Sequence, residues 1–209
     1  MLDLESIFSS DGVLSASIPG FHVRYQQLEM AQTIAESIGK HQVLVAEAGT
    51  GTGKTVAYLV PALLLGGKVI ISTGTKTLQD QLFERDIPMV RSALKVPITI
   101  ALLKGRANYI CHYHLEKTAQ DTHATFVNRD EIKYLHHIER FAKHSKTGDK
   151  SSLKDVPENA SIWQMVTSTR DNCLGSECAH FKQCFVMEAR KQALSADVVV
   201  VNHHLFFAD

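Results

Sequence analysis

The sequence has no excess of charge of either sign. Its 209 residues carry 22 Lys and Arg against 22 Asp and Glu, so the formal net charge is zero. This balance excludes a protein that coats nucleic acid through bulk positive charge, but it leaves room for a local basic groove. The length suffices for one large domain or two small ones.

Long hydrophobic runs are also missing. The longest apolar stretches, near 56–65 and 198–201, are far shorter than a membrane span. The N-terminal segment MLDLESIFSSDG is acidic and lacks the basic region of a secretory signal. We therefore expect a cytoplasmic protein that has no membrane partner.

Cysteine is scarce, with four residues in the chain. In a reducing compartment they are expected to be ligands, nucleophiles or core residues rather than disulfides. Cys173, Cys178 and Cys184 are spaced C-x4-C-x5-C, and Cys111 lies far upstream. A structural zinc site usually shows a close C-x2–4-C pair, whereas iron–sulfur clusters accept irregular spacings. The spacing alone leaves zinc, a cluster and unrelated free thiols open.

The first 103 residues alternate between helical and strand patterns. Helices are expected over 26–38, 54–65 and from 76 to 83, the last one ending or kinking before Pro88. Short apolar runs predict strands over 42–46, 68–72, 99–103 and, near the C-terminus, 197–201. Apolar strands separated by helices indicate a parallel sheet that is covered on both faces.

Between residues 104 and 185 the strand patterns disappear. A helix is expected over 128–143, a polar linker over 146–159 and a further helix over 187–194. The sequence therefore predicts an α/β domain, formed by residues 1–103 and 186–209, that is interrupted by a mainly helical domain over 104–185.

The segment AEAGTGTGKT, residues 46–55, lies between an expected strand and an expected helix. This is the context of a phosphate-binding loop, whose glycines let backbone N–H groups approach phosphate oxygens. Lys54 is predicted to reach the β- and γ-phosphates of ATP, and Thr55 to ligate Mg²⁺. The form A-x-x-G-x-G-K-T is the variant of helicase superfamilies one and two. The predicted contacts are Ala48, Gly49, Thr50, Gly51, Thr52, Gly53, Lys54 and Thr55.

Six segments, taken in order, resemble the XPD/DinG-type iron–sulfur DNA helicases of superfamily two, and a bacterial branch of that family most closely. The resemblance covers nearly the whole chain. The segments are IPGF at 18–21 with Arg24, Gln27 and Met30, EAGTGTGKT at 47–55, ISTGTKTLQDQL at 71–82, LLKGRANYIC at 102–111, DNCLGSEC at 171–178 with Cys184, and ADVVVVNHHLFFAD at 196–209.

The resemblance implies roles for the cysteines and for the first motif. It selects a [4Fe–4S] cluster among the three alternatives. It also implies that Arg24 and Gln27 belong to a motif that reads adenine, with Gln27 hydrogen-bonded to the base. The implied cluster ligands are Cys111, Cys173, Cys178 and Cys184.

Further residues are implied to contact DNA. Thr73 and Thr75 would bind phosphates of single-stranded DNA, and Lys104 and Arg106 would lie on a cationic path toward the cluster domain. A pair of solvated charges is the simpler interpretation of Lys104 and Arg106.

The implied fold is a partial RecA-like motor domain interrupted by a mainly helical [4Fe–4S] domain. The implied function is an ATP-dependent DNA helicase that moves 5′→3′ on single-stranded or forked DNA, in repair or damage tolerance, with a replication or repair protein as partner. The family's D-E-A-H box is expected beyond residue 209, so we interpret the chain as an N-terminal part that is inactive alone. The alternatives are a non-hydrolysing ATP- and DNA-binding or redox-sensing module, and a P-loop phosphotransferase.

Overall fold

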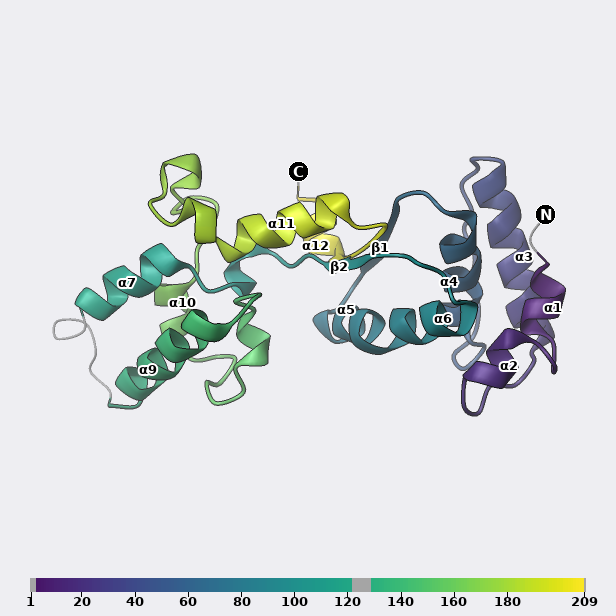
Figure 1. Cartoon of the computed structure of the whole chain (residues 1–209), viewed down its shortest axis with the longest axis horizontal. Coiled ribbons are helices and arrows are strands. Elements are labelled where there is room, and N and C mark those ends of the chain that lie inside the picture. Colours follow the sequence, from purple (N-terminus) through teal and green to yellow (C-terminus); the bar gives the residue numbers. More distant parts are fainter. Residues whose placement is uncertain (1–2, 122–128, 209) are drawn as a thin grey trace. The chain divides into compact units, whose positions relative to one another are not determined.

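The structure is a computed structural model that describes residues 3–121 and 129–208 (Figure 1). The chain divides into two compact units. Unit 1 consists of Met1–Leu102 and Ala196–Asp209, and unit 2 consists of Leu103–Ser195. Unit 2 is therefore an insertion, because the polypeptide leaves unit 1 at Leu102 and returns to it at Ala196.

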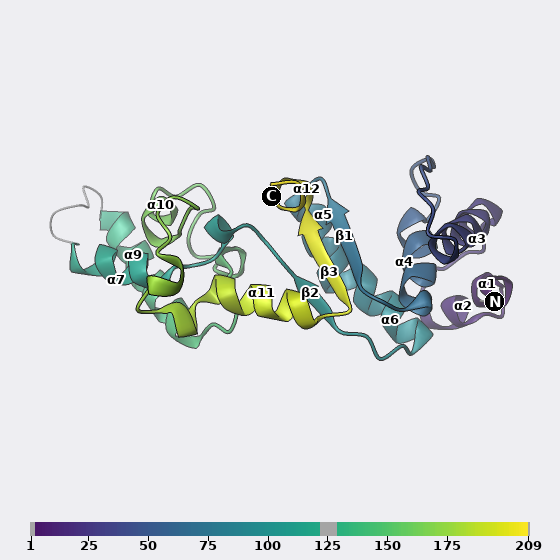
Figure 2. The same ribbon diagram turned by 90° about the horizontal axis from the view of Figure 1, so that it is seen from above.

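Unit 1 is built on a parallel sheet of three strands, β1 (Val69–Thr73), β2 (Ile100–Leu102) and β3 (Val198–Asn202). The strand order is β1-β3-β2, and Val198 lies opposite both Val69 and Ile100 (Figure 2). All four valines of β3 are buried, as expected of a strand that has neighbours on both edges. The strands predicted over 68–72, 99–103 and 197–201 are thus confirmed, as is a parallel α/β sheet.

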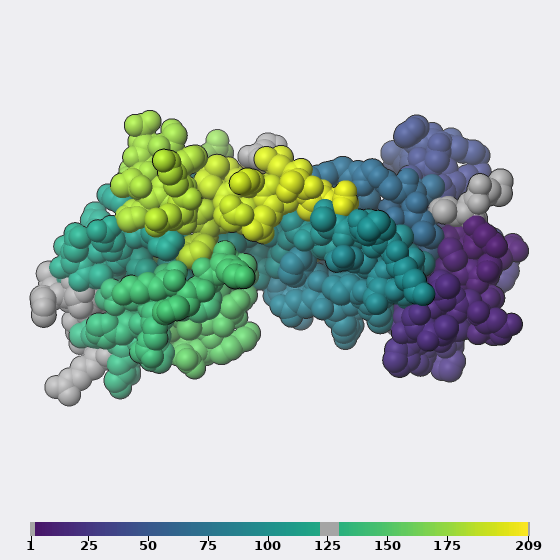
Figure 3. Space-filling view, viewed as in Figure 1, coloured from purple at the N-terminus to yellow at the C-terminus, as the bar shows by residue number. Residues whose placement is uncertain are grey.

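Helices pack around this sheet and around one another. Helix α3 lies against α4, α5 contacts both β1 and β3, and α2 packs on α6. The short helices α1 and α2 form a continuous purple patch on the surface of unit 1 (Figure 3). The helices are α1 (Leu4–Phe8), α2 (Val13–Ser17), α3 (Tyr25–Gly39), α4 (Lys54–Leu65), α5 (Lys76–Gln81), α6 (Ile87–Leu94) and α12 (His203–Phe206).

The predicted strand over 42–46 is wrong. The segment has no regular secondary structure, and Val43 and Val45 are 93% and 94% exposed. A strand needs a neighbour that pairs with its backbone N–H and C=O groups. None of the three described strands takes 42–46 as a partner, so its apolar composition alone does not make it a strand.

The predicted helix over 76–83 is confirmed only in its first part. Helix α5 ends at Gln81, and the chain continues as a π-helical turn, Leu82–Asp86, directly into α6. Pro88 lies in the first turn of α6. The missing N–H of proline costs nothing there, because the first N–H groups of a helix have no intrahelical partner. Pro88 therefore permits a helix to begin rather than stopping one.

Unit 2 is mainly helical and has its own core. Its helices are α7 (His112–Gln120), α9 (Arg129–His144), α10 (Ile162–Val166) and α11 (Phe185–Ser195). The helices expected over 128–143 and 187–194 correspond to α9 and α11, with residue 128 outside the described part of the chain. The fully buried side chains of this core include Ile110, Leu135, Ile138, Ile162 and Val166.

The segment 146–159, expected to be a polar linker, is folded into unit 2. It contains a 3₁₀ turn, Lys150–Ser152, and the buried residues Asp149 and Val156. Polar composition predicted a solvated segment, but the structure buries Asp149 in an ion pair, described below, and packs Val156 into the core of unit 2. Within residues 3–121 and 129–208, no helix is both long enough and apolar enough to cross a membrane.

Candidate functional site

The glycine-rich loop of unit 1 leads directly into α4. Gly51 and Gly53 have φ values of 79° and 81°, and Gly53 is the residue that precedes the helix. These left-handed conformations are readily adopted only by glycine. The loop therefore depends on its glycines for the tight turn that a phosphate-binding loop requires.

Lys54 is held against this loop. Its Nζ donates to the carbonyl oxygens of Ala48 and Gly49, at 2.8 Å each, and the Thr52 hydroxyl also donates to Gly49 O, at 2.9 Å. The ammonium group thus lies over the loop, close to the backbone that would surround a phosphate. Phosphate oxygens are stronger acceptors for an ammonium group than neutral carbonyls are, so this arrangement can exchange one partner for the other.

Gln27 supports the loop from α3. Its side chain is 2% exposed, and its Nε2 donates to the carbonyl oxygen of Gly53 at 2.9 Å. A Cβ atom at position 53 would come within 2.1 Å of Gln27 Nε2, so the contact also requires glycine. Among the residues that the structure describes, none donates a hydrogen bond to the buried Gln27 Oε1. The structure therefore brings Gln27 to the loop itself, whereas the Arg24 side chain is exposed just before α3.

Thr55 lies in the first turn of α4 and is partly buried. Burial raises the pKa of Tyr58, one turn along the helix, to about 12, and hydrogen bonding with the Thr55 side chain acts in the opposite direction. A hydroxyl oxygen is a hard ligand of the kind that Mg²⁺ accepts, usually beside waters and phosphate oxygens. The Thr55 hydroxyl at the start of α4 is therefore one oxygen donor of the kind that the magnesium ion of bound ATP accepts.

Thr73 and Thr75 lie in the turn from β1 to α5. Thr73 is buried, and its hydroxyl donates to the carbonyl oxygen of Thr75 at 3.1 Å. The exposed Thr75 caps α5, since its hydroxyl accepts from Leu78 N at 3.2 Å. Both hydroxyls thus stabilise the turn, and of the two side chains only that of Thr75 faces solvent.

Lys104 and Arg106 have different environments within unit 2. Lys104 is 5% exposed, forms an ion pair with Asp149 Oδ2 at 2.8 Å and donates to Ser151 Oγ at 3.2 Å. Arg106 is partly buried and lines the cysteine pocket. The simpler interpretation expected both residues to be solvent-exposed charges. The structure instead buries Lys104 and leaves Arg106 partly buried.

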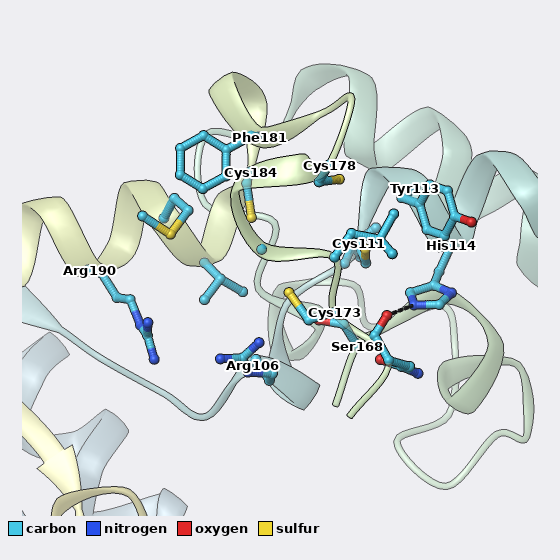
Figure 4. Close-up of a pocket in the computed structure, with 16 residues that line it drawn as sticks. Arg106, Cys111, Tyr113, His114, Ser168, Cys173, Cys178, Phe181, Cys184 and Arg190 are labelled. Atoms are coloured by element: carbon cyan, nitrogen blue, oxygen red, sulfur yellow. Dashed lines mark hydrogen bonds between the residues drawn. The ribbon is translucent and has the colours of Figure 1, made fainter. Parts of the chain in front are cut away.

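All four cysteines line one cavity of about 110 Å³ in unit 2, and all are free thiols. Figure 4 shows them around the pocket with Arg106 nearby. Cys111 precedes α7, Cys173 and Cys178 flank the 3₁₀ turn Gly175–Glu177, and Cys184 precedes α11. Tertiary structure thus unites cysteines that lie far apart in the sequence.

Backbone pairing fixes Cys111 in the pocket. Its N–H donates to Val166 O at 2.8 Å, and the N–H of Ile110 donates to Gly148 O at 2.9 Å. Burial raises the pKa of the Cys111 thiol above its ordinary value, backbone hydrogen bonds from residues 113 and 114 oppose that rise, and the charges of Cys178 and Cys184 add to it. Negative charge on Cys178 or Cys184 therefore makes the Cys111 thiol harder to ionise.

The arrangement of the thiols bears on the kind of group they could hold. Within residues 3–121 and 129–208, no three His, Cys, Asp or Glu side chains are grouped so that they could hold one metal ion. A [4Fe–4S] cluster makes a different demand, because each thiolate binds its own iron and the sulfurs surround the cluster. Four thiols that line one cavity fit that demand.

Three residues that contribute to these sites were not predicted from the sequence. Asp149 neutralises Lys104, Tyr58 is the partner of Thr55, and Gly148 lies against Phe185 beside Cys184. Only the spacing of Thr55 and Tyr58 on one helix could have been read from the sequence. The other two contacts join segments that are distant in the chain.

A parallel α/β sheet, with a glycine-rich loop that ends in Lys54 and Thr55 at the start of a helix, defines a P-loop nucleotide-binding domain. Residues 25–156 match the family model of the DEAD/DEAH box helicases. Since this match spans more than half of the chain, the protein belongs to the DEAD/DEAH box helicase family.

Similar proteins carry helicase names. The chain is 48% identical over 206 residues to ATP-dependent DNA helicase YoaA of Haemophilus influenzae and 52% identical over 202 residues to that of Escherichia coli, covering 99% and 97% of this chain. It is 36% identical to ATP-dependent helicase DinG of Mycobacterium tuberculosis, over 93% of this chain. The matches span about a third of the length of these relatives, 31% to 32%.

Proposed function

We propose that the chain is the ATP-binding part of an ATP-dependent DNA helicase. The observation that carries this proposal is the glycine loop with Lys54 held across it, in a chain of the DEAD/DEAH family. Lys54 and the loop amides bind the phosphates, Thr55 holds Mg²⁺, and Gln27 holds the loop in place. Mg²⁺ itself neutralises the charge that develops on the phosphates.

DNA is the proposed substrate of the complete helicase. Single-stranded or forked DNA is the substrate, translocation runs 5′→3′, and the enzyme acts in cytoplasmic DNA repair or damage tolerance with a replication or repair protein. The names of the relatives support DNA as the substrate. The exposed Thr75 and the backbone of its turn contact DNA phosphates, and Arg106 adds positive charge in the second domain.

Unit 2, Leu103–Ser195, is an iron–sulfur domain inserted into the motor domain, and it runs past the expected boundary at 185 because α11 belongs to it. Cys111, Cys173, Cys178 and Cys184 hold a [4Fe–4S] cluster, and the pocket that they line supports this assignment. The cluster is structural, because it links the loop 171–184 to the start of α7 and so restricts the unfolded chain.

Nucleotide binding is tested by titrating the chain with a fluorescent ATP analogue in the presence of Mg²⁺. Lys54→Ala removes the ammonium group and is expected to weaken binding at least tenfold, since charge-assisted contacts to phosphate are lost. The control is Lys40→Ala, at an exposed lysine paired with Glu36 on α3, which leaves binding unchanged. Equal affinities of the two variants would contradict the proposal.

The cluster is tested by anaerobic purification followed by iron and sulfide analysis. We expect four iron and four sulfide per chain, with loss of both in Cys173→Ser. Stoichiometric zinc without iron, or full iron in Cys173→Ser, would overturn the ligand assignment.

The direction of translocation is tested in a complete polypeptide that contains this chain, by comparing the unwinding of duplexes with 5′ and 3′ single-stranded tails. Preference for the 3′-tailed duplex would contradict 5′→3′ movement.

A further inference from the structure

Residues 171–184, here called the cysteine segment, carry three of the four cysteines, whereas Cys111 lies directly before α7. The segment contains two short 3₁₀ turns, Gly175–Glu177 and Phe181–Gln183. Its turns are closed by backbone hydrogen bonds between residues three apart, such as Cys178 N to Gly175 O at 3.3 Å. Because such bonds are local, they do not determine where the segment lies on α7.

A first contact between α7 and the cysteine segment comes from His114. Its Nε2 lies 3.3 Å from the carbonyl oxygen of Asn172, the residue before Cys173 (Figure 4). A carbonyl oxygen only accepts, so His114 is the donor in this hydrogen bond. Asn172 is itself fixed, since its Oδ1 accepts from Thr169 N at 2.7 Å and its N–H donates to Thr169 Oγ1 at 3.3 Å. His114 thus holds a part of the segment that is already ordered.

A second contact comes from Glu116, also on α7. The Nε2 of His180 donates to Glu116 Oε2 at 2.7 Å, and His180 lies between Cys178 and Cys184 in the chain. The other carboxylate oxygen, Oε1, accepts from Gln120 Nε2 at 3.5 Å on the same helix. The cysteine segment is therefore attached to α7 at two points, one on each side of Cys178.

The degree of exposure decides what these contacts can do. The side chains of His180 and Glu116 are 30% and 57% exposed, and an ion pair at such a site contributes little to the free energy of unfolding. Its effect is local, because it restricts a segment whose thiols would otherwise have to be ordered when a ligand binds. A binding site that is ordered beforehand holds its ligand more firmly.

We propose that His114 and Glu116 are positioning residues for the cluster, which hold the cysteine segment on α7 and so slow the loss of iron. The proposal rests on the proposed function, in which the four cysteines bind a [4Fe–4S] cluster. Neither side chain is a cluster ligand. His114 acts through Asn172, and Glu116 acts through His180.

The experiment follows the release of iron from the anaerobically purified, cluster-loaded chain of 209 residues to an excess of iron chelator. The loss of the visible absorbance of the cluster gives the rate. Glu116→Ala is expected to release iron about threefold faster than the wild type. Glu116→Gln is expected to release it at the wild-type rate, because its amide oxygen still accepts from His180.

The His114 contact is measured in the same way. His114→Phe keeps a ring in the pocket but cannot donate a hydrogen bond, and it is expected to release iron about threefold faster than the wild type. Combining His114→Phe with Glu116→Ala is expected to give about a tenfold increase, since the two contacts are separate and their effects add in free energy.

Asp155→Ala is the matched control. Asp155 is another exposed carboxylate of unit 2 that is paired with a histidine, with Oδ2 3.8 Å from His137 Nδ1, and the pair lies outside the cysteine segment. This variant is expected to release iron at the wild-type rate. With iron removed, Glu116→Ala is expected to melt no lower than Asp155→Ala. A lower melting temperature would make Glu116 a general stabiliser and overturn its positioning role.

The remaining outcomes separate this inference from the proposed function. A wild-type chain that contains no iron contradicts the cluster itself. If the wild type contains the cluster, release at the wild-type rate from Glu116→Ala or His114→Phe overturns the role of that residue, and the cluster assignment stands. The same holds if Glu116→Gln releases iron as fast as Glu116→Ala, because the hydrogen bond to His180 then has no effect.

Discussion

Gly148 shows how one residue can fix the packing around the cysteine pocket. It has a φ of 62°, and a Cβ atom there would lie 2.1 Å from Cδ2 of the buried Phe185. Phe185 directly follows Cys184, so a shift of its backbone would displace the cysteine as well. This close approach explains why glycine stands at position 148, in a segment that its polar composition predicted to be only a linker.

We predict that Gly148→Ala destabilises unit 2 by about 2 kcal/mol, because overpacking is added to backbone strain. Thermal unfolding followed by circular dichroism measures the change. Gly39→Ala is the control, since a Cβ atom there meets nothing within 4 Å and the position is helical. Equal melting temperatures for the two variants would contradict the packing argument.

Lys104 and Asp149 form a buried ion pair that ties the first residues of unit 2 to the segment 146–159. Lys104→Met leaves the carboxylate of Asp149 buried without its ammonium partner, which we expect to cost about 3 kcal/mol. Chemical denaturation measures this cost. Adding Asp149→Asn to Lys104→Met should recover part of the loss, because the uncompensated charge is removed while the acceptor for Ser151 N remains.

At the scale of elements, Asp197 joins the beginnings of β2 and β3. Its Oδ2 accepts from both N and Oγ1 of Thr99, at 2.7 Å each, and its own N–H donates to Thr99 Oγ1 at 3.0 Å. These hydrogen bonds from Thr99 lower the pKa of Asp197 below its ordinary value of 3.8. The charged form of the carboxylate is therefore the one that stabilises the strand pair.

The sign of the pH dependence follows from that lowered pKa. Because the native state binds this proton less readily than the unfolded state, the stabilisation is complete above pH 3.8 and is lost as the pH falls through the folded-state pKa. Asp197→Asn should thus unfold at a lower denaturant concentration than wild type at pH 7, with a difference that shrinks in acid. A difference that does not change with pH would contradict the argument.

The elements were predictable where their sequence pattern and their partners agree. The strands β1, β2 and β3 are apolar runs that find one another, and α3 and α4 show the expected periodicity. The segment 42–46 has the same apolar character but has no paired neighbour among the described strands, so it is irregular. The π-helical turn before α6 has no sequence signature in this chain, since it depends on how Asp86 and its partners pack.

At the scale of the whole molecule, the phosphate loop and the cysteines lie in different units. We therefore predict that Lys54→Ala weakens nucleotide binding at least tenfold but retains full iron, and that Cys173→Ser loses iron but still binds the ATP analogue. Metal analysis and nucleotide titration on the same two samples measure both outcomes. Loss of both properties in either variant would show that the units do not fold independently.

The sequence by itself determined the phosphate loop, the parallel α/β class, the inserted helical region and the family, because these depend on local patterns and on motifs in a fixed order. Only the tertiary structure decided that four distant cysteines line one cavity and that Lys104 is buried against Asp149. It also decided that Gln27 binds the loop carbonyl of Gly53. The physical reason is the same in each case: a contact between distant segments depends on how the whole chain packs, and no local pattern encodes it.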